Sequence, residues 1–243
     1  MIVAVAGMHR SGTSMFARYL HRAGIAMGER FYEDRRTNPY GHYEDEEFLA
    51  LQAREVAARC GGEDYLVTAD FTPSEEFHAA GAALVAARRA QHGDRPWGWK
   101  DPRTTLFLPS WRALADDLHV VAMLRPPDRV VNSLCARLHG YWSPRKKDLF
   151  LATYTHYNRK LLAFHDADPA RISIVDLERL IADPEPVLAA LSGRLPLPLD
   201  PALFRDSYDP AAMSRVRRAA LFLNRRGRRA AEQVHAELVA RAP

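Results

Sequence analysis

A glycine-bounded turn that follows a short apolar stretch constrains the fold of this chain more than any other sequence feature. Residues Ile2 to Ala6 form an apolar run with β-branched side chains, which is typical of a parallel strand covered on both faces. The turn itself reads Gly7-Met-His-Arg-Ser-Gly-Thr-Ser14. Its two glycines permit backbone conformations that other residues disfavour, and they leave amide groups open to a ligand. The pattern therefore predicts a strand, an anion-binding loop and a helix, in that order.

This turn matches the nucleoside-triphosphate pattern G-x-x-x-x-G-K-[ST] at every fixed position except the lysine. Gly7, Gly12 and Ser14 occupy the expected positions, but a threonine, Thr13, stands where the lysine belongs. That lysine reaches the β- and γ-phosphates of ATP or GTP, and the loop offers Arg10 as its cation instead. The helix that starts near Thr13 adds unpaired amides and the positive end of its dipole. We expect a phosphate site poorly suited to γ-phosphoryl transfer. The alternative is an ordinary strand–turn–helix corner.

Strand-like and helix-like segments alternate along the rest of the chain. Further strands are expected at 97–100, 119–124 and 171–175, and further helices at 49–60, 73–93, 128–138 and 211–243. The predicted fold class is α/β, with three layers and a mostly parallel sheet flanked by helices, as in P-loop NTPases. A length of 243 residues favours one domain, residues 1–243, with a basic helical C-terminal segment at 211–243.

Three local features follow from the residue patterns. The helix after the loop at 29–47 should bury a stripe made of Leu49, Ala53, Val56, Ala57 and Cys60. Thr72 should cap the next helix, because Pro73 and Glu75 suit its first and third positions. The proline-rich stretch 195–210 should be irregular.

Composition and charge limit the protein classes. Hydrophobic residues make up 47% and charged residues 26% of the chain, as in soluble globular proteins. A net charge of +4 is compatible with an anionic ligand and too small to indicate a nucleic acid. Cys60 and Cys135 show no metal-binding or redox spacing, which favours a reducing compartment. The first apolar run is too short for a signal peptide and no stretch reaches the length of a membrane span, so we expect a cytoplasmic enzyme.

A second phosphate-binding constellation is predicted in the middle of the chain. Arg125 follows a buried strand, at the end where open α/β sheets bind ligands, and Ser133 lies in the next helix. A planar guanidinium and a hydroxyl can bind the same phosphate. The alternative is that Arg125 ends the strand and pairs with Asp128.

These two segments together resemble a known family. Gly7-Met-His-Arg-Ser-Gly-Thr-Ser14 is similar to the loop that binds the 5′-phosphosulfate in sulfotransferases that use 3′-phosphoadenosine 5′-phosphosulfate (PAPS). Leu124-Arg-Pro-Pro-Asp-Arg-Val-Val-Asn-Ser133 resembles that family's second motif, whose arginine and serine bind the 3′-phosphate. Supporting stretches resemble the bacterial branch of the family: Asn38-Pro-Tyr-Gly-His-Tyr-Glu-Asp45, Trp99-Lys-Asp-Pro-Arg103 and Ile174-Val-Asp-Leu-Glu-Arg-Leu-Ile-Ala-Asp-Pro184.

The resemblance implies an in-line transfer of a sulfuryl group from PAPS to a hydroxyl or amine of a small acceptor, such as a sugar or natural product. It also implies that PAPS and its product adenosine 3′,5′-bisphosphate (PAP) are bound by Arg10, Ser11, Gly12, Thr13, Ser14, Arg125 and Ser133. Arg10 and the loop amides would stabilise the charge on the departing 5′-phosphate. Many family members have lysine at the position of Arg10. PAPS has no β–γ phosphate pair, so neither the missing lysine nor a metal is required.

The acceptor requires a base, which the resemblance implies in the segment at 40–45. Glu44 is the first candidate and His42 the second, because a carboxylate or imidazole can take a hydroxyl proton. The alternative for the run from Glu44 to Glu47 is an acidic first turn favoured by the helix dipole. Lys100, at a strand end, could contact the transferring sulfonate, with Asp101 orienting it. The alternative for Lys100 is a solvated lysine.

The residues alone leave other functions open. A P-loop kinase of small metabolites would use Ser14 and Asp176 around magnesium, with C-terminal arginines as a lid, but the missing lysine opposes it. A non-catalytic nucleotide-binding or nucleic-acid-binding protein would use the basic C-terminal segment, although no recognition motif supports it. The expected partner is a small-molecule acceptor, with no nucleic acid, membrane or metal. Its pocket is expected at 29–47, 141–147 and 195–208, and the resemblance implies that a C-terminal arginine covers the 3′-phosphate.

Overall fold

The computed structural model describes residues 1–33, 41–61, 66–137, 144–210 and 224–243 of the chain. At its centre is a parallel sheet with the strand order β2-β1-β3-β4. The strands are β1 (Ile2–Ala6), β2 (Trp97–Lys100), β3 (Leu118–Leu124) and β4 (Ile172–Asp176). The predicted strands are confirmed to within one residue at each end, and every pairing among them is parallel.

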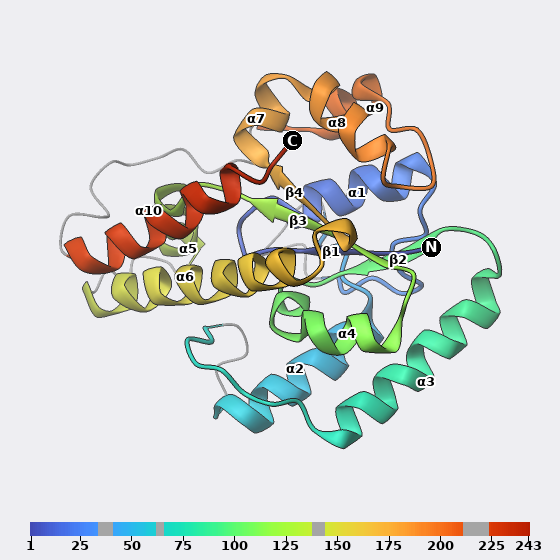
Figure 1. Cartoon of the computed structure of the whole chain (residues 1–243), viewed down its shortest axis with the longest axis horizontal. Helices are drawn as coiled ribbons and strands as arrows, with labels where there is room; N and C mark the ends of the chain where they lie inside the picture. Colours follow the sequence, from blue (N-terminus) through green and yellow to red (C-terminus); the bar gives the residue numbers. More distant parts are fainter. Residues whose placement is uncertain (34–40, 62–65, 138–143, 211–223) are drawn as a thin grey trace.

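Helices cover both faces of this sheet, as Figure 1 shows. One face carries α1 (Thr13–Ala23), α7 (Leu177–Ala182), α8 (Pro184–Ser192) and α9 (Pro201–Ser207). The other face carries α2 (Glu46–Cys60), α3 (Glu75–His92), α4 (Leu108–Leu114) and α6 (Pro144–Ala167). The helices α5 (Pro127–Arg137) and α10 (Arg225–Val239) pack against α6, and short 3₁₀ turns lie at Pro102–Phe107 and Pro169–Arg171. The predicted three-layer α/β class is confirmed.

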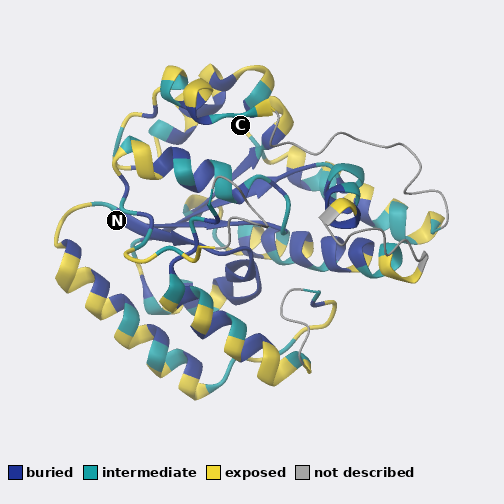
Figure 2. Ribbon diagram, turned by 180° about the vertical axis from the view of Figure 1, so that it is seen from behind, coloured by how far each residue is buried: buried dark blue, intermediate teal, exposed yellow. Residues whose placement is uncertain are grey.

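The strands divide their side chains between two apolar cores, because successive residues of a strand point to opposite faces. Ile2, Ala4 and Ala6 lie in the core on the side of α2 and α6, whereas Val3 and Val5 lie in the core on the side of α1. Figure 2 shows the strands buried and the outer faces of the helices exposed. Burial on both faces explains why the strands read as uninterrupted apolar runs.

The strand order fixes where a ligand can bind. From β1 the chain crosses to β2 on one side of it and then to β3 on the other. In open α/β sheets, ligands bind in the crevice beyond the carboxyl ends of the strands at such a switch point. Gly7 follows β1, and Arg125 follows β3, which pairs directly with β1. The two predicted phosphate-binding segments therefore begin at neighbouring strand ends.

The buried face of α2 differs from the predicted stripe. Its buried residues are Phe48, Leu51, Gln52, Glu55 and Val56, whereas Ala57 is exposed and Leu49 and Ala53 are half-buried. Glu55 tolerates burial because its carboxylate accepts hydrogen bonds from the backbone N and the Oγ of Ser74, at 2.6 and 2.8 Å. Polar side chains with partners therefore occupy part of the buried face, and an apolar stripe does not reveal them.

Two other local predictions were wrong. The residue that caps α3 is Ser74, whose Oγ accepts a hydrogen bond from the backbone N of Phe77 at 3.1 Å, and not Thr72. The hydrogen bonds from Ser74 to Glu55 hold this cap in place. The stretch 195–210 contains α9, because Asp200 caps the backbone N of Ala202 at 2.8 Å and Pro201 suits the first helical position.

No described helix is both long enough and apolar enough to cross a membrane. Residues 225–239 of the predicted C-terminal helical segment form α10, and residues 211–223 lie outside the described part of the chain. The prediction of one domain over the whole chain stays a prediction.

Candidate active site

The loop after β1 begins at a position that only glycine fits. Gly7 has φ 130°, and a Cβ built there would lie 2.4 Å from the carbonyl oxygen of Met123 in the neighbouring strand. Its N–H donates to the Oγ1 of Thr105 at 2.9 Å. Thr105 is fully buried, so this bond fixes the start of the loop against the turn at Pro102–Phe107.

The loop ends at the start of α1 with backbone amides directed to a possible anion. Arg10 has φ 72°, an uncommon left-handed conformation for a residue with a side chain. Gly12, with φ 88°, is the N-cap residue of α1, and no side chain caps this helix start. The first turn of α1 contains no acidic residue. Its amides and dipole are therefore left to an anionic ligand.

The two predicted phosphate-binding segments are joined by hydrogen bonds. The Nε of Arg10 donates to the Oγ of Ser133 at 2.8 Å. The Nη1 of Arg125 donates to the backbone oxygen of Arg10 at 3.0 Å. No ion pair joins Arg125 to Asp128, although both residues are described. Residues that are more than a hundred positions apart thus form one junction, and Arg125 contacts the loop instead of its neighbour in sequence.

A cavity of about 320 Å³ opens beside this junction. Six predicted site residues line it: Arg10, Thr13, Ser14, His42, Glu44 and Lys100. Ser11, Gly12, Arg125 and Ser133 are not among its lining residues. Of these, Arg125 and Ser133 reach the cavity wall through their bonds to Arg10. The sequence-predicted donor side and acceptor side therefore meet at one opening.

A buried ion pair between Lys100 and Glu44 lies in the cavity wall. The Nζ of Lys100 donates to the Oε1 of Glu44 at 2.5 Å and to the backbone oxygen of His42 at 3.1 Å. Lys100 is 1% exposed and Glu44 is 7% exposed. Burial alone would raise the pKa of Glu44, but Lys100, helped by His42 and Arg103, lowers it below its ordinary value. The Glu44 carboxylate is therefore ionised, and Lys100 is not a solvated lysine.

Asp101 and Arg103, which follow Lys100 in the chain, form a second buried ion pair. The Nη1 of Arg103 donates to both carboxylate oxygens of Asp101, at 3.1 and 3.2 Å. Burial raises the pKa of Asp101 to about 6, against the lowering effect of Arg103. Gln52 on α2 donates from its Nε2 to Asp101 at 3.2 Å and accepts from the Nε1 of Trp111 at 3.0 Å. This network fixes the end of β2, and with it the position of Lys100.

Several lining residues were not singled out as site residues in the sequence. They are His9, Leu49, Ala53, Pro102 and Leu134, whereas Tyr32 lies in the predicted pocket segment 29–47 and Arg103 ends one of the family-like stretches. Leu49 and Ala53 are the residues that the predicted stripe of α2 placed in the core. Their i, i+4 spacing indicated an apolar face correctly, but that face borders the cavity. The lining therefore contains apolar side chains as well as the charged pair of Lys100 and Glu44.

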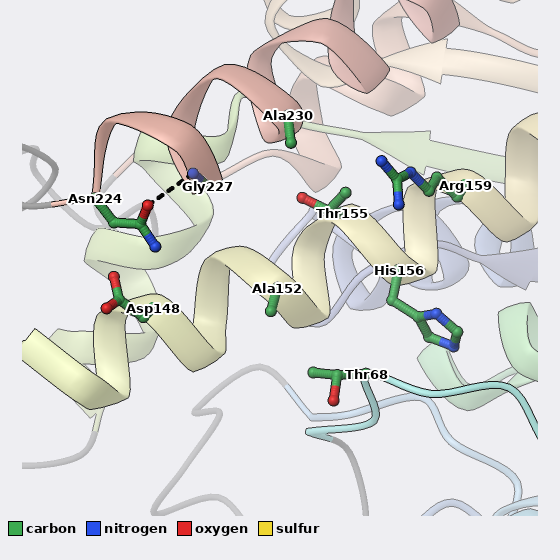
Figure 3. A pocket seen from close by; sticks show the side chains of 9 residues that line it. All are labelled: Thr68, Asp148, Ala152, Thr155, His156, Arg159, Asn224, Gly227 and Ala230. Carbon is green, nitrogen blue, oxygen red and sulfur yellow. Dashed lines mark hydrogen bonds between the residues drawn. The ribbon is translucent and has the colours of Figure 1, made fainter.

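A second cavity, of about 250 Å³, lies between α6 and the start of α10, as Figure 3 shows. Its lining residues are Thr68, Asp148, Ala152, Thr155, His156, Arg159, Asn224, Gly227 and Ala230. None of the predicted site residues lines it. The first cavity, which gathers those residues, is the candidate active site.

The remaining predicted segments contribute unequally. Leu195, Leu199 and Phe204 are buried in the core on the side of α1, and no residue of 195–208 lines the first cavity. Residues 34–40 and 141–143 and the arginines Arg215, Arg217 and Arg218 lie outside the described residues. Within the described parts of the chain, no three His, Cys, Asp or Glu side chains are grouped as a metal ion requires. Independence from metal stays a prediction.

The sequence matches the family model described as "Sulfotransferase family" over residues 3–201. No curated protein matches it significantly. The structure is similar to a sulfotransferase domain from the curacin biosynthetic pathway, with a TM-score of 0.62, 15% identity and coverage of 100% of this chain and 98% of that one. It is also similar to the sulfotransferase domain of the Synechococcus PCC 7002 olefin synthase, with a TM-score of 0.60, 20% identity and coverage of 98% and 94%. Sulfotransferase STF1 from Mycobacterium tuberculosis H37Rv has a TM-score of 0.53, 18% identity and coverage of 99% and 76%. At these identities the structural likenesses establish the fold alone.

Proposed function

The chain belongs to the sulfotransferase family, and from that membership we propose that it transfers a sulfuryl group from PAPS to a hydroxyl or amine of a small acceptor. The observation that carries the proposal is the junction of Arg10, Ser133 and Arg125 beside the cavity. Two anion-binding segments in direct contact suit a donor with a phosphosulfate at one end and a 3′-phosphate at the other. We also propose that the enzyme is bacterial and acts in the cytoplasm.

The chain's own residues fit such a donor. The uncapped start of α1, the guanidinium of Arg10 and the hydroxyls of Thr13 and Ser14 all offer hydrogen-bond donors to the phosphosulfate. Ser11 and Gly12 belong to the same loop and are assigned to the donor through their backbone. Arg125 and Ser133 are assigned to the 3′-phosphate. Glu44, the only carboxylate among the described residues that line the cavity, is paired with Lys100, so the described wall carries no uncompensated negative charge.

Glu44 is proposed as the base. The acceptor oxygen forms the new S–O bond while its proton passes to the Glu44 carboxylate. The bond between sulfur and the 5′-phosphate oxygen breaks, and its electron pair leaves on that oxygen, which gives PAP. Arg10 and the loop amides stabilise this charge. Lys100 uses two of its three N–H groups for Glu44 and the His42 carbonyl, so the third remains for the sulfonate.

The shape of the cavity bears on the acceptor. Leu49 and Ala53 on α2 and Leu134 on α5 add apolar side chains to a lining that also contains charged groups, and Tyr32 is an exposed aromatic lining residue. A sugar or natural product with one hydroxyl near Glu44 and an apolar face toward α2 fits this combination. The loop lacks the lysine of a P-loop kinase, and the family match does not favour that alternative.

Thermal-shift titration tests the proposal. PAP without magnesium should raise the melting temperature of the protein, and Mg-ATP should have little effect, because the loop lacks the lysine for a γ-phosphate. The Arg125→Ala variant should lose much more affinity for PAP than for adenosine 5′-phosphate (AMP). Arg129→Ala is the matched control, since Arg129 lies on α5, the helix that follows Arg125, and pairs with Glu178 at 3.2 Å. Stabilisation by Mg-ATP and not by PAP would contradict the proposal.

A further inference from the structure

The C-terminal helix α10 reaches the residue that we assign to the 3′-phosphate. The family match ends at residue 201, so α10 (Arg225–Val239) lies beyond the matched region. It packs along α6 through Ala231, Val234 and Leu238, which are all buried. Between the buried residues Val234 and Leu238, His235 is half-buried and points toward α6. A helix beyond the stretch that the family model matches thus contacts the core beside the proposed donor site.

The contact passes through one tyrosine of α6. The hydroxyl of Tyr154 donates to the backbone oxygen of Arg125 at 2.8 Å and lies 3.1 Å from the Nδ1 of His235. A carbonyl oxygen can only accept, so the single hydroxyl proton belongs to that bond and the imidazole must donate from Nδ1. Burial lowers the pKa of His235, opposed by Asp176, Glu178 and Asp128, so the ring is neutral near pH 7. This fixes its tautomer, with the proton on Nδ1.

The backbone at Arg125 depends on such an anchor. Arg125 comes directly after β3, where sheet pairing ends, and two prolines follow it, Pro126 and Pro127. Prolines have no amide hydrogen, so the turn cannot be held by its own N–H groups at these positions. The fully buried Tyr154 supplies a hydrogen bond from outside the turn.

The same arginine continues the connection to the loop. Arg125 donates to the backbone oxygen of Arg10, and Arg10 donates to Ser133. A continuous chain of hydrogen bonds therefore runs from α10 through α6 to the loop at the start of α1. Its members are His235, Tyr154, Arg125, Arg10 and Ser133.

We propose that Tyr154 and His235 are positioning residues for the 3′-phosphate, which act by holding the backbone of Arg125 and thereby make α10 part of the donor site. This inference rests on the proposed function. Neither side chain needs to touch the nucleotide. Their effect is confined to the ligand group that Arg125 binds, which separates positioning from a general contribution to folding.

The test measures the dissociation constants of PAP and AMP by calorimetry on the full chain. Tyr154→Phe removes both hydrogen bonds of the hydroxyl, including the one to Arg125, and keeps the ring. PAP should therefore bind about three- to tenfold more weakly, whereas AMP affinity should change less than about twofold. Tyr19→Phe is the matched control, because Tyr19 is also fully buried and its hydroxyl donates to a backbone oxygen, at 3.2 Å, but to that of Asp200 and not of Arg125. It should leave the ratio of the two affinities unchanged.

Variants of His235 provide an independent test of the same inference. His235→Leu should weaken PAP binding in the same selective way, and His235→Asn should restore it, because the asparagine amide can donate from nearly the position of Nδ1. Equal losses for PAP and AMP in these variants, or no loss, would overturn the inference. If Tyr154→Phe does not fold, the comparison of His235→Leu with His235→Asn tests the inference alone. A wild-type protein that does not prefer PAP to AMP would instead contradict the proposed function, so the two failures are distinguishable.

Discussion

At Gly7 the adjacent strand leaves no room for a side chain. A Cβ would lie 2.4 Å from the Met123 oxygen, and φ is 130°. Gly7→Ala should therefore lower the free energy of unfolding by more than about 2 kcal/mol, since both strain and overpacking act at this position. Gly193→Ala is the control, because its nearest contact would be an ordinary 3.5 Å and its φ is −72°. Urea unfolding measures the free energy of unfolding of both variants. Equal values for Gly7→Ala and Gly193→Ala would contradict this prediction.

Glu44 is the residue on which the proposed proton transfer depends. Glu44→Gln should reduce PAP release with a mixed panel of hydroxylated acceptors by about 10²- to 10⁴-fold, because an amide cannot take the proton. The affinity for PAP should stay within about twofold, since no role in donor binding is assigned to it. Glu46→Gln, a change at a half-exposed position of the same segment, should be fully active. Full activity of Glu44→Gln together with a loss in His42→Gln would move the base role to His42.

The sequence predicted several residues that line the cavity, but not the partners of their side chains. Glu44 and Lys100 were separate candidates, since nothing in the pattern shows that side chains 56 residues apart form an ion pair. Gln52 was not predicted at all, because a lone glutamine between Leu51 and Ala53 gives no signal of its hydrogen bonds to Asp101 and Trp111. Long-range polar contacts depend on the tertiary fold, which local spacing does not contain.

Among the secondary-structure elements, those with strong local signals were predicted best. β1 is apolar throughout and β3 is apolar except for His119, and α1 lies between Gly12 and Gly24, so the limits of these elements are visible in the sequence. Which face of α2 is buried was not visible in the sequence, because the polar residues Glu55 and Gln52 lie on that face. The long helix α6 was missed for a related reason: buried Thr153, Thr155 and Asn158 interrupt its apolar pattern, and each bonds a carbonyl one turn earlier.

The contact between β3 and β4 makes the stability of the protein depend on pH. His119 in β3 is buried, and its Nε2 is 2.9 Å from the Oγ of Ser173 in β4. Burial, with Arg194 and Arg171, lowers the pKa of His119 from 6.5 to about 4. Between these values the unfolded chain binds a proton that the folded chain does not. The free energy of unfolding should therefore fall as the pH drops from 6.5 to 4, by roughly 3 kcal/mol from this group.

The matched variant is His119→Gln, whose amide can reach Ser173 but does not titrate. Urea unfolding at several pH values should show a shallower decline for this variant than for the wild type over the same interval. Other groups titrate in both proteins, so the difference between the two profiles isolates His119. Identical profiles would show that His119 is protonated in the folded state as easily as in the unfolded chain.

For the whole molecule, the sequence predicted the fold class because the class follows from the order of elements. The alternation of strands and helices indicated a parallel sheet, and the strand ends at Gly7 and Arg125 indicated the edge of the sheet where the candidate site lies. The attachment of α10 could not be predicted, since its arginines dominate the pattern and its buried residues, Ala231, Val234 and Leu238, are few. Whether α10 unfolds with the rest tests the prediction of one domain.

Leu238 is the probe for that test, because it is fully buried in the core that also contains Trp97, Trp99 and Trp111. Leu238→Ala should lower the free energy of unfolding by about 2–5 kcal/mol, and tryptophan fluorescence and circular dichroism should report a single coincident transition. Val239→Ala, at a neighbouring position that is 37% exposed, should cost less than about 0.5 kcal/mol. A separate early transition by circular dichroism alone would contradict the prediction.

The bond between Arg10 and Ser133 has a consequence for how the protein is made. A ribosome delivers the chain from its amino end, and 123 residues separate the two partners. At the usual speed of translation the first of them waits roughly 6 to 25 s for the second. The glycine loop is thus synthesised well before Ser133, and His235 follows later still. A nascent chain should acquire nucleotide only after both of these residues have been made.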